Sequence, residues 1–270
     1  MKTVCPYNFT ELKVHVMDGV AMLTMNRPHR KNALTPTLVN ELIVALEWAG
    51  DDTGVGAVIL TGEGEVFCSG ADLKEMRKGP KPPAEGIPSR GGFVELNLAF
   101  TKIGKPTIAK VRGLALAGGL GLMAACTFAI SDEKAIFGTP EIHRGIFPMM
   151  IMANIFRLVP RRLGLELILV GNPIDAQQAR DWGLLNRVVA PSALDEEAFG
   201  FAAALANRPP NTMRIGLEAF YKQSDMSVEE ALPWLETQLF SCLTTPDAAE
   251  GVMAFLEKRE PDWAKVRQSD

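Results

Sequence analysis

Short apolar runs alternate with amphipathic stretches through the first 190 residues of the chain. Two of these runs flank the dipeptide Asp18-Gly19. An Asp-Gly dipeptide between two strand-like segments favours a β-hairpin. Strands that alternate with helices usually form a parallel sheet with helices packed on it, so the pattern predicts an α/β fold. The runs that predict strands are 14–16, 20–25, 55–61, 107–111, 128–131, 135–137 and 187–189.

The amphipathic stretches predict the helices, and two of them carry capping signals. Thr35-Pro36 and Asp175 each stand where a helix begins, since Thr and Asp side chains accept bonds from first-turn amides and proline suits the first position. We expect an α/β core over residues 1–193 and a helical region over 194–270, with a Gly/Pro-rich loop at 78–92. The other helical stretches are a short helix at the end of the Gly-rich turn 62–76, 93–103, a helix from Gly118, 148–158, 163–170, 199–206, 212–223, 228–244 and 247–258.

Composition narrows the class of protein. The 270 residues are 47% hydrophobic and 22% charged, as in an ordinary globular protein, and a net charge of −4 disfavours nucleic acid as a partner. Four cysteines without a CxxC pair and three scattered histidines predict neither disulfides nor a metal site. No apolar run reaches the 18 or so residues of a membrane span, and the N-terminus lacks the apolar segment of a signal peptide. We therefore expect a cytoplasmic protein.

Two of the glycine-rich turns lead from a predicted strand into a helix, at 67–74 and at 116–121. Amides in the first turn of a helix have no intrahelical acceptor and carry partial positive charge. Two such turns that face each other could direct two amides at one oxygen atom, which is the arrangement of an oxyanion hole. The alternative is that both are simply tight turns.

A dinucleotide site is a second interpretation of the later turn. Gly119, Gly121 and Ala124 fit the pattern G-x-G-x-x-A, and Glu141 follows 20 residues after Gly121, where a ribose-binding acid is expected. The match lies in the middle of the chain, and two strands are predicted before Glu141, so the simple strand-helix-strand unit fits poorly. The sequence contains neither the G-x-S-x-G motif of serine hydrolases nor the GK[ST] of a P-loop.

Three segments in this order resemble the crotonase family, also called the enoyl-CoA hydratase/isomerase superfamily. They are FCSGADLKEM, KVRGLALAGGLGLMAACTFAISDEKAIFGTPEIHRGIFP and GNPIDAQQARDWGLLNRVV, and the resemblance runs from about residue 12 to 260. It implies a spiral of β-β-α units whose C-terminal helices form a homotrimer or a dimer of trimers. It also implies an acyl-CoA thioester as substrate, with coenzyme A part of that substrate and no separate cofactor. An acyl-CoA site removes the need for the dinucleotide interpretation.

The resemblance assigns catalytic residues by position. Ala71 and Gly118 match the two residues whose amides hold the thioester oxygen, and Glu141 matches a catalytic glutamate. Hydratases of this family use a second glutamate, whose position is taken here by Gly121. One carboxylate is enough to move a proton from C2 to C4, so an isomerase-type reaction is favoured. A hydratase (lyase) that uses a single glutamate and a non-catalytic acyl-CoA-binding homologue are the alternatives. Restoring a glutamate at position 121 is expected to raise hydration.

The same resemblance points to residues around coenzyme A and the acyl group. Glu95 and His143 could reach the reaction pocket, although a solvated glutamate and a packed histidine are the commoner situations. Met149, Met150 and Met152 could line the acyl pocket or belong to the core. Phe255 and Trp263 fall in the region that closes the coenzyme A site in relatives. The residues expected to contact coenzyme A are Arg30, Lys31, Ala71, Asp72, Leu73 and Lys74.

Overall fold

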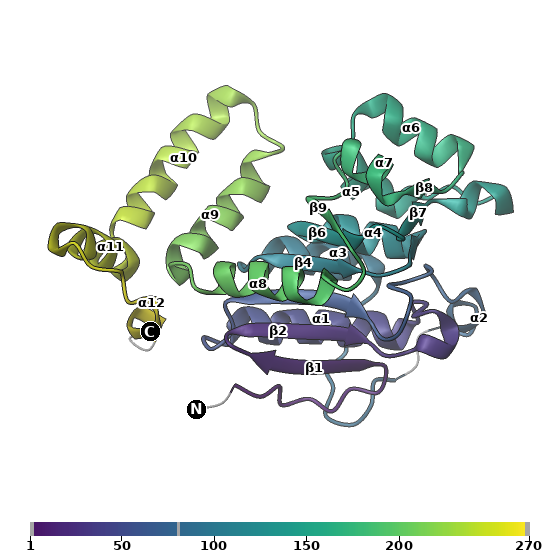
Figure 1. The fold of residues 1–270 in the computed structure, drawn as a ribbon, viewed down its shortest axis with the longest axis horizontal. Helices are drawn as coiled ribbons and strands as arrows, with labels where there is room; N and C mark the ends of the chain where they lie inside the picture. The colour runs from purple at the N-terminus through teal and green to yellow at the C-terminus, as the bar shows by residue number, and fades with distance from the viewer. Residues whose placement is uncertain (1–2, 80–81, 268–270) are drawn as a thin grey trace.

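The computed structural model describes residues 3–79 and 82–267, and it confirms the predicted α/β fold. Figure 1 shows the strands gathered at the centre and a group of helices that extends away from them. In the described chain the larger sheet has six strands. Their order is β1 (Leu12–Met17), β2 (Val20–Met25), β3 (Ala57–Gly62), β4 (Thr107–Val111), β6 (Phe128–Asp132) and β9 (Arg187–Val189).

The first two strands form the predicted antiparallel hairpin, with Met17 opposite Val20. Asp18 and Gly19 have φ values of 50° and 75°, the left-handed conformation that the favoured hairpin turn requires at both central positions. All the other neighbouring strands of this sheet run parallel. Parallel neighbours need crossover connections, and each of the four connections here contains at least one helix.

The predicted capping residues are confirmed. The Thr35 hydroxyl accepts a hydrogen bond from the Leu38 amide (3.0 Å), and the Asp175 carboxylate accepts one from the Gln178 amide (2.8 Å). The helices before residue 190 are α1 (Pro36–Asp51), α2 (Leu73–Met76), α3 (Phe93–Lys102), α4 (Gly118–Ala125), α5 (Met149–Leu158), α6 (Arg161–Val170) and α7 (Ala176–Asp181), with short 3-10 helices at Pro28–Arg30 and Pro140–Arg144. The predicted loop at 78–92 has neither helix nor strand in its described part, and residues 80–81 lie outside the described residues.

Two hydrophobic clusters pack on the larger sheet. The main one joins the sheet to α1, α3 and α4 and contains large side chains such as Leu42, Phe67 and Phe100. The second joins the sheet to α8 (Leu194–Ala206), which contacts it through a stripe that includes Ala198 and Ala202. Because α8 completes the cover of the sheet, the layered core reaches Ala206, and the division expected at residues 193/194 stays a prediction.

A second, three-stranded sheet lies beside the site described below. Its order is β5 (Leu114–Leu116), β7 (Ile136–Gly138) and β8 (Ile174–Asp175). Strands β5 and β8 were not predicted: β5 lies in the glycine-rich run before α4, and β8 has two residues next to the cap of α7. Strands β5 and β7 are parallel, with Leu116 opposite Gly138, so their carboxyl ends meet at one edge. Helix α4 begins just after β5, and the 3-10 helix Pro140–Arg144 begins just after β7.

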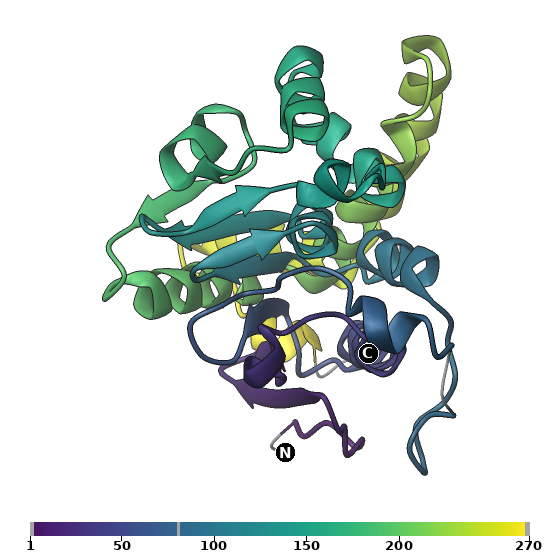
Figure 2. The ribbon, with the colours of Figure 1, turned by 90° about the vertical axis from the view of Figure 1, so that its right-hand side faces the viewer.

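The last helices extend away from the sheets, as the views of Figures 1 and 2 show for α9 and α10. They are α9 (Pro210–Gln223), α10 (Val228–Leu243), α11 (Pro246–Glu257) and α12 (Trp263–Arg267). Large apolar side chains are exposed on them: Phe220, Val228, Leu232, Leu239, Phe240, Leu243, Val252, Met253, Phe255 and Leu256. Among the described residues, no helix is both long and apolar enough to cross a membrane.

Candidate active site

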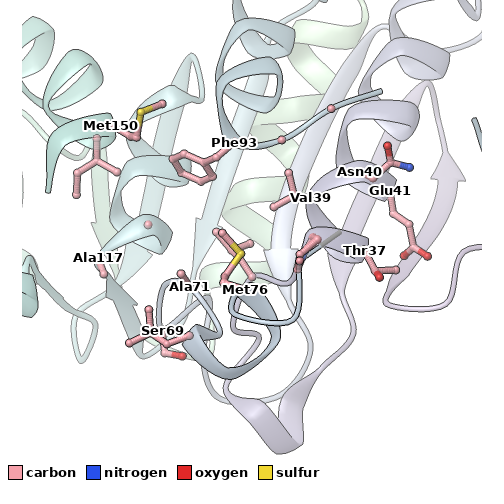
Figure 3. A pocket seen from close by; sticks show the side chains of 18 of the residues that line it. Thr37, Val39, Asn40, Glu41, Ser69, Ala71, Met76, Phe93, Ala117 and Met150 are labelled. Atoms are coloured by element: carbon pink, nitrogen blue, oxygen red, sulfur yellow. The ribbon is translucent and has the colours of Figure 1, made fainter. Parts of the chain in front are cut away.

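A cavity of about 820 Å³ opens where the ends of β5 and β7 meet the loop before α2. That volume is within the roughly 300–1,000 Å³ typical of small-molecule sites. Figure 3 shows Ala71 and Ala117 at one end, with Phe93, Met150, Val39 and Met76 around the same space. Apolar atoms dominate its surface, so a bound group is largely removed from water.

Ala71 lies in this cavity wall with its backbone fixed on both sides. The Leu34 amide donates to the Gly70 carbonyl (2.8 Å), and the Asp72 amide donates to the Leu34 carbonyl (2.8 Å). This is a parallel bridge between Leu34 and Ala71, so the Ala71 amide between the two bonds points away from Leu34. The Ala71 amide is therefore a fixed donor for a ligand oxygen.

Gly118 provides the second amide, at the first position of α4, where an amide has no intrahelical acceptor. A β-carbon built on Gly118 would lie 3.8 Å from the Ala71 nitrogen, which places the two backbones side by side. The same β-carbon would meet its neighbours at ordinary van der Waals distances, 3.5 Å or more. Close packing therefore does not require glycine at 118.

The turn before Gly118 holds a strained backbone. Ala117 has φ 52° and ψ −129°, a conformation that costs an L-residue about 1–3 kcal/mol. Its amide donates to the Gly138 carbonyl (2.8 Å), and this bond ties the turn to the end of β7. Gly70 has φ 96°, and a β-carbon there would lie 2.7 Å from the β-carbon of Ala117, so glycine is required at 70. Both donor turns are thus locked against each other before any ligand binds.

Glu141 lines the same cavity from the 3-10 helix after β7 and is half-buried. Its Oε2 atom is buried and has no hydrogen-bond partner among the described residues. Burial raises the pKa of the Glu141 carboxyl, and a bond to its own backbone and the charge of Arg144 offset only part of that rise. A buried carboxylate oxygen without a partner is costly unless it has a ligand to serve. The structure therefore brings Ala71, Gly118 and Glu141 together around one cavity.

Gly121 does not face the cavity in the way the sequence implied. It lies on α4 behind Ile151 of α5, and Ile151, not Gly121, lines the cavity. A β-carbon on Gly121 would lie 2.1 Å from Cγ2 of Ile151, far inside contact distance. A glutamate placed at 121 alone would collide with Ile151, so the packing disfavours the gain of hydration expected from the sequence, and that gain stays a prediction.

The other lining carboxylate, Glu41, is already occupied. Its Oε1 accepts hydrogen bonds from the Thr10 amide (2.8 Å) and hydroxyl (2.7 Å), and its Oε2 accepts one from the Glu11 amide (2.8 Å). Glu41 holds the N-terminal segment against α1. Glu141 is therefore the lining carboxylate with an oxygen free to act.

Arg27 is a structural residue of the site that was not predicted from the sequence. The buried guanidinium pairs with Glu11 (3.1 Å) and Asp72 (3.1 Å) and donates to the Ala33 carbonyl (2.5 Å). It therefore connects the 28–34 segment to the loop that carries Ala71. No motif marked it, and its role depends on three segments that meet only in the fold.

Only two of the six residues expected to contact coenzyme A line the cavity. Ala71 and Leu73 line it, while the Asp72 carboxylate is committed to Arg27 and to the first turn of α2. The segment with Arg30 and Lys31 touches the same loop, since the Lys31 carbonyl accepts from the Ser69 amide (3.1 Å). Arg30, Lys31 and Lys74 are exposed and outside the described lining, so their coenzyme A roles stay predictions.

Two further candidates have structural roles. The Glu95 carboxylate accepts from the Gly92 amide (2.7 Å) and caps α3 while exposed. The His143 ring is 3.2 Å from the Gly171 carbonyl, and His143 is absent from the described lining of the cavity. Met149 and Met150 do line the cavity, whereas Met152 does not. Among the described residues no cluster of His, Cys, Asp or Glu is placed to hold a metal ion.

Comparison with known proteins identifies the fold and the family. The family model described as enoyl-CoA hydratase/isomerase matches residues 15–266. A solved structure of an enoyl-CoA hydratase from Mycobacterium smegmatis superposes with a TM-score of 0.86 at 34% identity, covering 94% of this chain and 99% of that one. This similarity confirms the crotonase fold expected from the sequence motifs.

Two relatives extend over nearly the whole chain. A probable enoyl-CoA hydratase of Rhizobium meliloti is 36% identical over 262 residues, covering 95% of this chain and 98% of its own. A probable mitochondrial enoyl-CoA hydratase of Dictyostelium discoideum is 36% identical over 245 residues, covering 90% of this chain and 87% of its own length. The names of the relatives thus refer to hydration, whereas the residues of the cavity provide one available carboxylate.

Proposed function

The chain belongs to the enoyl-CoA hydratase/isomerase family, and from this premise we propose that it moves a proton within an enoyl-CoA thioester, converting a 3-enoyl to a 2-enoyl group. The observation that carries the proposal is the partnerless buried oxygen of Glu141 in the cavity that Ala71 and Gly118 also line. An isomerisation of this kind needs one group that removes a proton and returns it, together with donors for the enolate oxygen.

The two amides would stabilise the charge that develops on the thioester oxygen. Removing one such donor in other enzymes costs about 2.7–4 kcal/mol of transition-state stabilisation. The strain at Ala117 and the bridge between Leu34 and Ala71 hold both amides in place before reaction. The donors therefore need little reorganisation as charge moves onto the oxygen.

Glu141 would carry the proton. Its carboxylate takes the C2 proton of a 3-enoyl-CoA, the electron pair spreads over the dienolate, and the same proton is delivered to C4. No atom is gained or lost by the substrate. Because burial raises the pKa of Glu141, its carboxylate is a stronger base than an exposed glutamate and its acid a competent donor near neutral pH.

Hydration is the second candidate, and the names of the relatives favour it. In that reaction a water oxygen adds to C3 of a 2-enoyl-CoA and a proton is added at C2, with Glu141 as the single acid–base group. A third reading, a homologue that binds acyl-CoA without turnover, needs the cavity but not the free oxygen of Glu141.

The discriminating experiment supplies the purified protein with a 3-enoyl-CoA and, separately, with a 2-enoyl-CoA. The proposal expects the 2-enoyl product from the first and little 3-hydroxyacyl-CoA from the second. Rapid formation of 3-hydroxyacyl-CoA would instead establish the hydratase. Tight binding of a saturated acyl-CoA without turnover of either substrate would establish the non-catalytic homologue.

We also propose that the exposed apolar face of α9–α12 assembles copies of the chain into a homotrimer or a dimer of trimers. Ten large apolar side chains are exposed on these helices, more than an isolated soluble chain usually leaves in contact with water. The cytoplasm is the proposed location, and cell fractionation tests it, since several relatives are named as mitochondrial.

A further inference from the structure

Gly121 and Ile151 are packed so closely that only one of them can have a side chain. A β-carbon on Gly121 would lie 2.1 Å from Cγ2 and 2.7 Å from Cβ of Ile151. Ile151 is only 3% exposed, and Gly121 is buried on the facing helix. The Ile151 side chain therefore occupies the volume that a side chain at position 121 would need.

Ile151 also forms the cavity wall at this place. Its branched hydrocarbon offers no hydrogen bond, and a water molecule needs about two to four polar partners to be held. The cavity that Glu141 also lines is therefore bounded at Ile151 by a group that cannot hold or activate water. A change at position 151 acts directly on the lining, whereas a change at 121 acts only through Ile151.

Hydrogen bonds between helices keep Ile151 in this position. Asn154, one turn further along α5, donates to Oδ1 of Asn97 (2.6 Å) and to the Gly121 carbonyl (3.3 Å). Asn97 in turn donates to the Phe93 carbonyl on α3 (2.7 Å). These bonds join α5 to both α3 and α4, so Ile151 has little freedom to turn away from Gly121.

We propose that Ile151 determines which reaction the cavity performs, because its side chain takes the space of a second acid and denies water a place beside the substrate. The inference rests on the proposed proton transfer and deepens it. With Ile151 in place, the proton removed by Glu141 returns to carbon and no water oxygen is added. With that space given to a carboxylate, water can be held and activated, its oxygen adds to C3, and a proton is added at C2.

The test compares four proteins with both substrates: wild type, Gly121→Glu, the double variant Gly121→Glu/Ile151→Ala, and the matched double variant Gly121→Gln/Ile151→Ala. The glutamate double variant is expected to hydrate a 2-enoyl-CoA about 10²-fold faster than the glutamine one, the lower end of general acid–base effects. Gly121→Glu alone is expected to show no such gain. Equal hydration by the two double variants, or a full gain in the single one, would overturn the proposal.

A gentler pair keeps the test decisive if the double variants fold poorly. Ile151→Val and Ile151→Thr have the same shape, but only threonine has a hydroxyl that can hold a water molecule. The ratio of hydration to isomerisation is expected to be higher for threonine than for valine, and equal ratios would refute the role of Ile151. Wild-type protein that does not isomerise a 3-enoyl-CoA refutes the proposed function instead, so the two failures are separable.

Discussion

Replacing Gly121 with alanine tests the packing between α4 and α5 with a single methyl group. Two effects of this substitution on the free energy of unfolding oppose each other. Alanine is better than glycine inside a helix by about 0.8–1.0 kcal/mol. Against this, the new β-carbon would lie 2.1 Å and 2.7 Å from two carbons of Ile151, where about 3.5–4.0 Å is normal.

The cost of the close contact with Ile151 is expected to exceed the gain in helix propensity. Overpacking a filled core costs about 1–3 kcal/mol, and the hydrogen bonds of Asn154 restrain α5 from moving aside. Subtracting the helix gain of about 0.8–1.0 kcal/mol leaves a net loss in the free energy of unfolding of up to about 2 kcal/mol. For a chain of this size each kcal/mol lowers Tm by about 2–4 °C, so the expected fall is several degrees.

Thermal and urea unfolding of the four proteins of a double-mutant cycle measure this coupling. Ile151→Ala alone leaves a hole and is expected to cost about 2–5 kcal/mol, but in that background Gly121→Ala removes part of the hole and should cost less or even stabilise. The reasoning is refuted if Gly121→Ala raises the stability of the wild-type protein, or if the two substitutions are additive.

Three other predictions concern acid–base behaviour, the support of the oxyanion loop and assembly. The base is the carboxylate form of Glu141, so kcat for isomerisation is expected to fall as pH falls through the raised pKa of this group. The acidic limb of the pH profile should therefore lie above the ordinary glutamate range, and a limb at the ordinary position would contradict burial of this group. Arg27→Met keeps the apolar stem but leaves the Glu11 and Asp72 carboxylates without the guanidinium that pairs with them. It should lower the free energy of unfolding by about 3–5 kcal/mol in denaturant melts and lower kcat. An unchanged melt would show that the ion pairs do not hold this loop. Analytical ultracentrifugation should give three or six times the 29.3 kDa chain mass, and Phe240→Glu on the exposed face should reduce it, whereas a wild-type monomer would refute assembly through α9–α12.

Much of the architecture could be predicted because local signals agree with the fold. The Asp18-Gly19 turn and the cap at Thr35 are local, since their bonds join residues close in sequence. Strands β5 and β8 were not predicted because they lie next to a glycine-rich turn and a helix cap, and only their pairing with β7 defines them.

In the candidate site, too, some features could be predicted from the sequence and others depend on the fold. Ala71, Gly118 and Glu141 follow from motifs, and the structure brings them around one cavity. The meaning of Gly121 could not be predicted, because its neighbour Ile151 is 30 positions away on another helix. The sequence shows a missing acid, whereas only the packing shows that the space has been filled.

The most direct test of the account is the effect of Glu141→Gln on the conversion of a 3-enoyl-CoA. Glutamine keeps the shape of the side chain but cannot take and return a proton, so kcat is expected to fall by about 10²-fold or more. Binding of a saturated acyl-CoA should persist, and the matched change Glu95→Gln, at the exposed cap of α3, should leave kcat nearly unchanged. A Glu141→Gln protein that isomerises the substrate at the wild-type rate would contradict the central claim.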